Sequence, residues 1–104
     1  MDTPKIITLD LTNCKYLGEM HLRIKEAFDF PDYYGQNWSA FWDLLRDPRD
    51  YTIVEIKGLE TLSKDFNPHV QKMLEIMERN KDEQNDFMKK YPQFDYRFDY
   101  KVID

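Results

Sequence analysis

The nine residues from Phe94 to Val102 constrain the fold most, because apolar and polar side chains alternate there without a break. Such alternation places one set of side chains on the buried face of a β-strand and the other set in water. The apolar set consists of Phe94, Tyr96, Phe98, Tyr100 and Val102. The sequence therefore predicts a strand here, with one face packed against a core.

Two more strands are predicted upstream, each next to helical patterns. Lys5–Leu11 and Tyr51–Lys57 are short, apolar and rich in β-branched residues, and Gly58 ends the second. Apolar residues spaced three and four apart predict an amphipathic helix over Leu17–Phe28 and another from Asn37 to Leu45.

The chain after the second strand is predicted to be mostly helical, and the segment around Asn80–Gln93 is expected to be either a second contact surface or a solvated helix end with a loop. Leu59–Phe66 is expected to form a short helical turn. Asn67 followed by Pro68 predicts an N-cap and the first position of a longer helix. The apolar stripe of that helix consists of Val70, Met73, Leu74 and Met77. The polar run Glu78–Asp86 is expected to carry the helix out of the core and to fray.

The order of these elements predicts an α/β fold. Strands separated by helices pair in parallel through crossover connections. Three strands, the last with a polar face, favour a two-layer structure over a doubly wound one. We therefore predict a single domain over residues 1–104, in which helices cover one side of a three-stranded parallel sheet.

The charge of the chain bears on its partners. Twenty acidic and fifteen basic residues give a net charge of −5, which argues against non-specific nucleic-acid binding. An acidic surface suits a positively charged partner. The single cysteine, Cys14, cannot form an internal disulfide, and no stretch approaches a membrane-spanning length. We expect a cytoplasmic protein that binds no membrane and needs no cofactor.

Catalytic residue types are few. His21 and His69 have no partner at a metal-ligand spacing, and the chain's three glycines make no phosphate-binding loop. The alternative is a small enzyme that uses Cys14 with one of these histidines, but no local sequence motif supports it.

The segment Phe30–Leu45 combines a loop with the second helix. Pro31 stops the first helix, Gly35 can adopt a positive φ, and Asn37 can cap the next helix. Asp47-Pro48 is predicted to end it. One interpretation is that its aromatic residues are all core: Tyr33, Tyr34, Trp38, Phe41 and Trp42. The other is that part of this set, together with Asp43, forms a surface that inserts into another protein.

This segment resembles the signature of the barstar family, intracellular inhibitors of secreted bacterial ribonucleases such as barnase. The family pattern is close to P-x-Y-Y-G-x-N-x-D-A-L-W-D-x-L, and the resemblance extends over Lys5–Leu59. The matching residues, in register without a gap, are Pro31, Tyr33, Tyr34, Gly35, Asn37, Ala40, Trp42, Asp43 and Leu45. The fold of that family is a small parallel sheet covered by helices.

The resemblance implies an inhibitor that plugs the cationic active site of a ribonuclease. Asp43 would occupy the place of a substrate phosphate and bind the enzyme's arginines and catalytic histidine. Tyr33 would lie against the enzyme's groove with Trp42 beside it, and Gly35 and Asn37 would shape the loop. No catalytic residue is implied, and the free protein is expected to be a monomer.

Two departures leave alternatives open. Ser39 stands where the family usually has a second interface aspartate, and Asp32, Asp47 or Glu78 are candidates to compensate for it. The acidic contributor from the later helix is either Glu75 or Glu78.

The predicted partner is a secreted basic ribonuclease. The alternatives are immunity to a toxin that is not a ribonuclease and an interaction module whose inhibitory surface has drifted.

Overall fold

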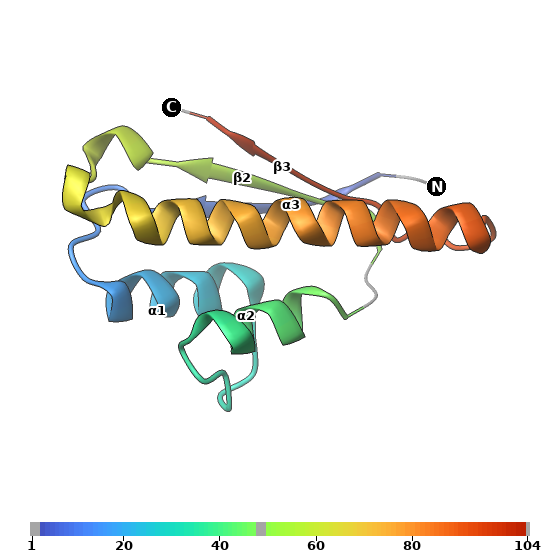
Figure 1. Ribbon diagram of the computed structural model, residues 1–104, viewed down its shortest axis with the longest axis horizontal. Helices are drawn as coiled ribbons and strands as arrows, with labels where there is room; N and C mark the ends of the chain where they lie inside the picture. The colour runs from blue at the N-terminus through green and yellow to red at the C-terminus, as the bar shows by residue number, and fades with distance from the viewer. Residues whose placement is uncertain (1–2, 48–49, 104) are drawn as a thin grey trace.

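The computed structural model describes residues 3–47 and 50–103, so Pro48 of the predicted helix stop lies outside the described residues. The elements follow one another as a strand, two helices, a strand, two 3-10 turns, a long helix and a strand (Figure 1). Their bounds are β1 Lys5–Asp10, α1 Leu17–Phe28, α2 Trp38–Leu45, β2 Thr52–Lys57, the turns Leu59–Thr61 and Lys64–Phe66, α3 Asn67–Lys90, and β3 Phe98–Val102.

The sheet has the order β1-β2-β3, and both strand pairs are parallel. In its middle Ile7, Val54 and Tyr100 lie side by side across the three strands. This arrangement confirms the predicted α/β class with a three-stranded parallel sheet.

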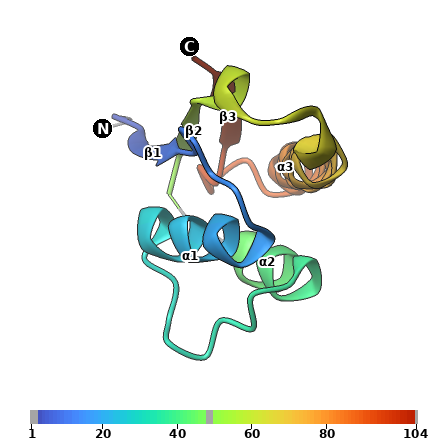
Figure 2. The same cartoon turned by 90° about the vertical axis from the view of Figure 1, so that its left-hand side faces the viewer.

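The helices cover one face of this sheet. α1 packs against β1, α3 packs against β3, and α2 packs against α3 (Figures 1 and 2). The opposite face carries cross-strand ion pairs, among them Lys101 Nζ to Glu55 Oε2 at 3.3 Å. The largest fully buried side chains come from both layers: Leu9, Leu11, Met20, His21, Ile24, Phe28, Phe41, Leu45, Val54, Ile56, Met73 and Met77.

α3 differs from its prediction at both ends. It begins at Asn67, and Phe66 is the residue at the N-cap position, so the predicted N-cap at Asn67 is wrong. The second 3-10 turn runs directly into the helix there. The polar run neither leaves the core nor interrupts the helix, since Asn80 is only 1% exposed and Gln84 is buried. Gln84 Nε2 donates to the Arg46 carbonyl and to Asn80 Oδ1, each at 3.4 Å.

The last strand is shorter than the alternation predicts. β3 begins at Phe98, which pairs with Thr52, the first residue of β2. Because β2 provides no earlier partner, Phe94 and Tyr96 leave the sheet and stack on each other with ring centroids 5.1 Å apart. Both rings also contact Phe87 of α3. Phe94 and Val102 are exposed rather than buried, so only part of the predicted apolar face belongs to the core.

Candidate functional site

The loop between α1 and α2 is fixed by local hydrogen bonds. Asn37 Oδ1 accepts from the Ala40 amide at 2.8 Å, which confirms the predicted cap, worth about 1 kcal/mol in typical helices. Asn37 Nδ2 also donates to the Gly35 carbonyl. The expected positive φ at Gly35 is wrong, because the left-handed residue is Gln36 at 53°. Gly35 provides room instead: a Cβ there would lie 3.0 Å from Asn37 Nδ2.

Beneath this loop, His21 joins α1 to the segment that follows. Its side chain is 1% exposed, and its Nδ1 lies 2.6 Å from the Tyr34 hydroxyl. The imidazole also packs on Trp38, with ring centroids 4.4 Å apart. Burial raises the pKa of Tyr34, so its hydroxyl stays protonated and able to donate to a neutral imidazole. These contacts hold the loop and the start of α2 on α1.

Burial, and secondarily the charge of His69, lowers the pKa of His21 from its ordinary 6.5. A base with a lower pKa in the folded state contributes its full stability above the unfolded pKa and loses it as pH falls below that value. We therefore expect the free energy of unfolding to decline below pH 6.5, by up to about 1.4 kcal/mol per pH unit. Urea unfolding between pH 5 and 8 measures this.

The control for this prediction uses both histidines. His21→Gln is expected to remove most of the decline, whereas His69→Gln is expected to keep most of it, because burial is the larger cause of the shift. A decline of equal slope in wild type and His21→Gln would contradict the prediction.

The aromatic residues of the segment divide between core and surface, so the interpretation that all are core is wrong. Tyr34 and Phe41 are buried, whereas Tyr33 is 79% exposed. Trp38 and Trp42 are partly buried and pack against the core. Tyr33 in the loop is therefore open to solvent, and the two tryptophans of α2 are partly so.

A groove of about 260 Å³ lies between α2 and α3. It is lined by Trp38, Ser39, Trp42, Asp43, Lys72, Ile76 and Arg79. The structure thus brings together three of the predicted partner-binding residues, Ser39, Trp42 and Asp43. Gly35 and Asn37 lie in the loop that leads into α2, as does Tyr33.

Two arginines and a glutamate, which the sequence did not predict as part of the site, gather around Trp42. The guanidinium carbons of Arg46 and Arg79 lie over its ring, 5.0 Å and 4.5 Å from the centroid. The carboxylate of Glu83 connects the two arginines, with N–O distances of 3.8 Å and 3.4 Å. The spacing of Lys72, Ile76, Arg79 and Glu83 by four, three and four residues was a signal that they share a face of α3.

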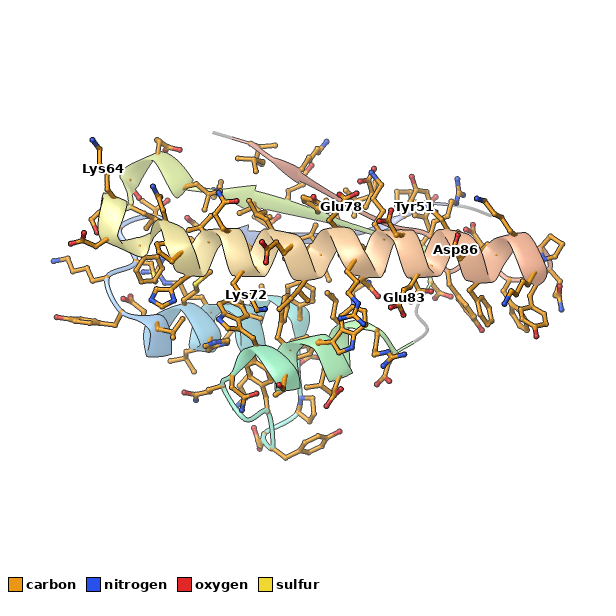
Figure 3. All side chains as sticks on the ribbon, viewed as in Figure 1. Tyr51, Lys64, Lys72, Glu78, Glu83 and Asp86 are labelled. Atoms are coloured by element: carbon orange, nitrogen blue, oxygen red, sulfur yellow. The ribbon has the colours of Figure 1, made fainter. Side chains whose placement is uncertain are left out.

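The acidic candidates for compensating Ser39 lie elsewhere. Glu78 accepts a hydrogen bond from the Tyr100 hydroxyl at 2.7 Å, so it lies on the side of α3 toward β3, away from Lys72 (Figure 3). Burial, followed by this hydrogen bond, raises the pKa of Tyr100 to about 12. Asp32 forms an ion pair with Lys25. Asp47 lines a separate cavity, so none of these three carboxylates lines the groove.

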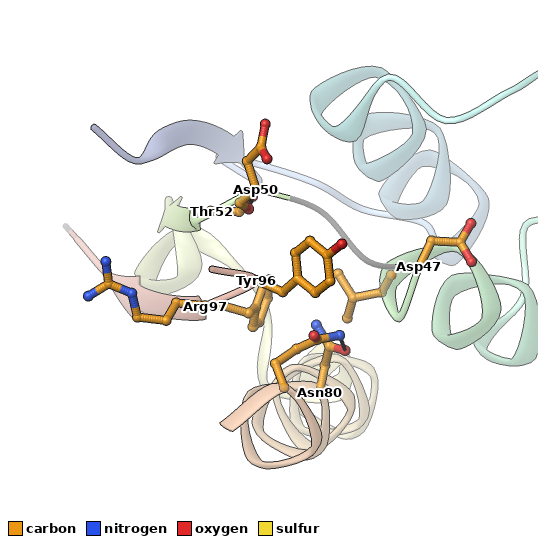
Figure 4. A pocket seen from close by; sticks show the side chains of 9 residues that line it. Asp47, Asp50, Thr52, Asn80, Tyr96 and Arg97 are labelled. Atoms are coloured by element: carbon orange, nitrogen blue, oxygen red, sulfur yellow. Dashed lines mark hydrogen bonds between the residues drawn. The ribbon is translucent and has the colours of Figure 1, made fainter. Parts of the chain in front are cut away.

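That separate cavity lies between α3, the end of α2 and the strands (Figure 4). Asp47, Asp50, Asn80 and Tyr96 are among the residues around it. Its volume of about 10 Å³ corresponds to about one water molecule. It is too small for a substrate.

Among the described residues, no hydrogen bond joins Cys14 to His21 or His69. Burial raises the pKa of Cys14, which favours the unreactive thiol, and its Sγ donates to the Tyr16 carbonyl. His21 contacts Tyr34, and His69 contacts the ring of Phe66. Within residues 3–47 and 50–103, no group of three His, Cys, Asp or Glu side chains could hold a metal ion. No helix in those ranges is long and apolar enough to cross a membrane.

Most of the chain is similar to known proteins. Residues 5–95 match the model of the family described as Barstar (barnase inhibitor), which extends the resemblance beyond Lys5–Leu59. A curated relative from Bacillus subtilis (strain 168), named "Putative ribonuclease inhibitor YrdF", is 29% identical over 84 residues. The alignment covers 80% of this chain and 92% of the relative. Both descriptions name inhibitors rather than enzymes.

Proposed function

The chain belongs to the barstar family, a family of inhibitors rather than enzymes, and we propose that it blocks the active site of a basic bacterial ribonuclease. In this proposal, the loop before α2 and the exposed side of α2 enter the cationic site of a secreted enzyme. The inhibitor acts in the cytoplasm of the producing cell, as a monomer when free, and protects the cell's own RNA.

The observation that carries the proposal is the setting of Asp43. Its carboxylate is exposed on α2 and has no ion pair with any residue in the described part of the chain. A ribonuclease must offer cations to the phosphates of RNA. A free carboxylate can take the position of such a phosphate and accept charge-assisted hydrogen bonds from those cations.

The surroundings of Asp43 support the same role. The Asn37 cap, the contact of His21 with Tyr34 and the arginines over Trp42 fix the loop and helix before any partner arrives. A surface that is already ordered loses little conformational entropy on binding. Tyr33, exposed in the loop before α2, adds an aromatic side chain of the kind that dominates interface energies.

The direct test is titration of purified protein into barnase and into a basic ribonuclease encoded beside this gene, with RNA cleavage as the readout. We expect activity to fall to zero at one inhibitor per enzyme and the inhibition to be competitive with RNA. Tyr33→Ala is expected to weaken inhibition, whereas Tyr16→Ala, at the other end of α1 and similarly exposed, is expected to leave it unchanged. A folded protein that inhibits no ribonuclease would refute the proposal.

A second candidate is immunity to a toxin that is not a ribonuclease. It is favoured by Ser39, which provides no carboxylate, and by the cations of α3 in the same groove. A complex with a neighbouring toxin that lacks ribonuclease activity, formed through the same face of α2, would support this candidate instead.

A further inference from the structure

The groove between α2 and α3 does not share the acidic character of the chain. Three cations, Lys72, Arg79 and Arg46, line it or lie over Trp42 at its wall. Among the described residues that line the groove or form ion pairs with these arginines, the carboxylates are Asp43 and Glu83. Because the whole chain has a net charge of −5, this surplus of positive charge is a local feature of the surface proposed to bind the ribonuclease.

The charges of the groove are not neutralised among themselves. Glu83 is shared by Arg46 and Arg79, so it balances at most one of them. Lys72 is exposed, and none of the described residues forms an ion pair with it. Asp43 lines the same groove, yet no ion pair joins it to Lys72 or Arg79 across the two described helices. Both a carboxylate and an ammonium group are therefore left for a partner.

We propose that the target ribonuclease places an acidic side chain in this groove, against Lys72 and Arg79, beside the cationic residues that meet Asp43. The inference rests on the proposed function and specifies its partner: the surface opposite α2 and α3 carries both signs of charge.

The charges of two surfaces that bind each other must be complementary. If the enzyme presented only cations here, Lys72 and Arg79 would be covered by like charge, and Ser39 has only a neutral hydroxyl to offer them. Like charges facing each other across an interface oppose binding strongly, and opposite charges determine register and partner choice. A carboxylate reaching Arg79 can accept paired hydrogen bonds from a guanidinium whose position is already fixed on Trp42.

The proposal is tested by whether reversing the charge of Lys72 raises or lowers the Kd. Lys72→Glu is measured against the ribonuclease that the wild type inhibits, barnase or the enzyme encoded beside this gene. If an acid faces Lys72, we expect Kd to rise by about tenfold or more. If the enzyme presents only cations, the new carboxylate removes repulsion and Kd falls. A fall in Kd, or an unchanged Kd, overturns the inference.

Lys64→Glu is the matched control, since it makes the same change of charge at an exposed lysine in the second 3-10 turn, away from α2 (Figure 3). We expect its Kd to stay within about threefold of wild type, because exposed charges at a distance are screened by salt. Thermal unfolding is expected to be unchanged in both variants, since neither lysine forms an ion pair with a described residue.

Asp43→Ala, measured in parallel, separates the inference from the proposed function. Weaker binding of Asp43→Ala together with tighter binding of Lys72→Glu would retain the inhibitor and reject the acidic partner residue. Loss of binding in both variants supports both statements. A wild type that inhibits no ribonuclease overturns both.

Discussion

Asp43→Ala is expected to raise the Kd for the inhibited ribonuclease by about 100-fold or more, corresponding to roughly 3 kcal/mol of binding free energy. The reason is that the enzyme's cations, desolvated in the complex, would lose the carboxylate that pairs with them. Most of the change is expected in the dissociation rate, since truncation of a buried charged partner acts there. Stopped-flow association together with surface plasmon resonance measures both rates.

The fold is expected to remain intact in this variant. Asp43 is exposed and makes no ion pair within the described residues, so its removal should shift stability by less than about 0.5 kcal/mol. Asp43→Asn keeps the shape and removes only the charge, and it should lose most of the same affinity. Asp65→Ala, an exposed acid in the second 3-10 turn, is the matched control and should bind like wild type. A lower Tm in Asp43→Ala would instead assign a structural role to this residue.

The fold class was predictable because it depends on periodicity. The helical spacing over Leu17–Phe28 and the β-branched stretch over Tyr51–Lys57 each give their element within a residue of where it lies. Periodicity indicates which secondary structure a segment forms, but the length of a strand depends on the strand with which it pairs. The alternation continues back to Phe94, whereas the ladder stops at Phe98, where β2 begins.

The conformation of the loop before α2 could be predicted only in part from local sequence preferences. The cap at Asn37 was predictable because a side chain and an amide three residues away are enough to form it. The positive φ lies at Gln36 rather than Gly35, since the path of the loop onto His21 and Trp38 decides which residue turns. Asn80 and Gln84 are buried for a comparable reason, because they face the chain just after α2.

The candidate site was predictable on α2 and not on α3. Ser39, Trp42 and Asp43 lie three and four residues apart on one helix, so their shared face follows from sequence. Which side of α3 meets that face depends on how the two helices are rotated against each other. For that reason the predicted acid Glu78 lies at β3, while Lys72 and Arg79 line the groove.

Phe41→Ala is expected to be the most damaging substitution for stability, with a loss of about 3–5 kcal/mol in the free energy of unfolding. Phe41 is 0% exposed, and its ring contacts Phe28 of α1, Phe30 of the loop and Trp38 of α2. Removing the ring leaves a cavity at the point where these three segments meet. Because small domains have only about 5–15 kcal/mol of stability, the loss is a large share of the total.

Urea and thermal unfolding followed by circular dichroism measure this loss, which should lower Tm by more than about 10 °C. Tyr33→Ala is the matched comparison: it removes an aromatic ring from the same segment, but an exposed one, and should leave Tm nearly unchanged. Phe41→Ala should therefore lose inhibition together with its fold, whereas Tyr33→Ala should inhibit more weakly while its fold stays intact. Lost inhibition at an unchanged Tm in Phe41→Ala would move Phe41 from the core to the partner surface, contrary to its burial.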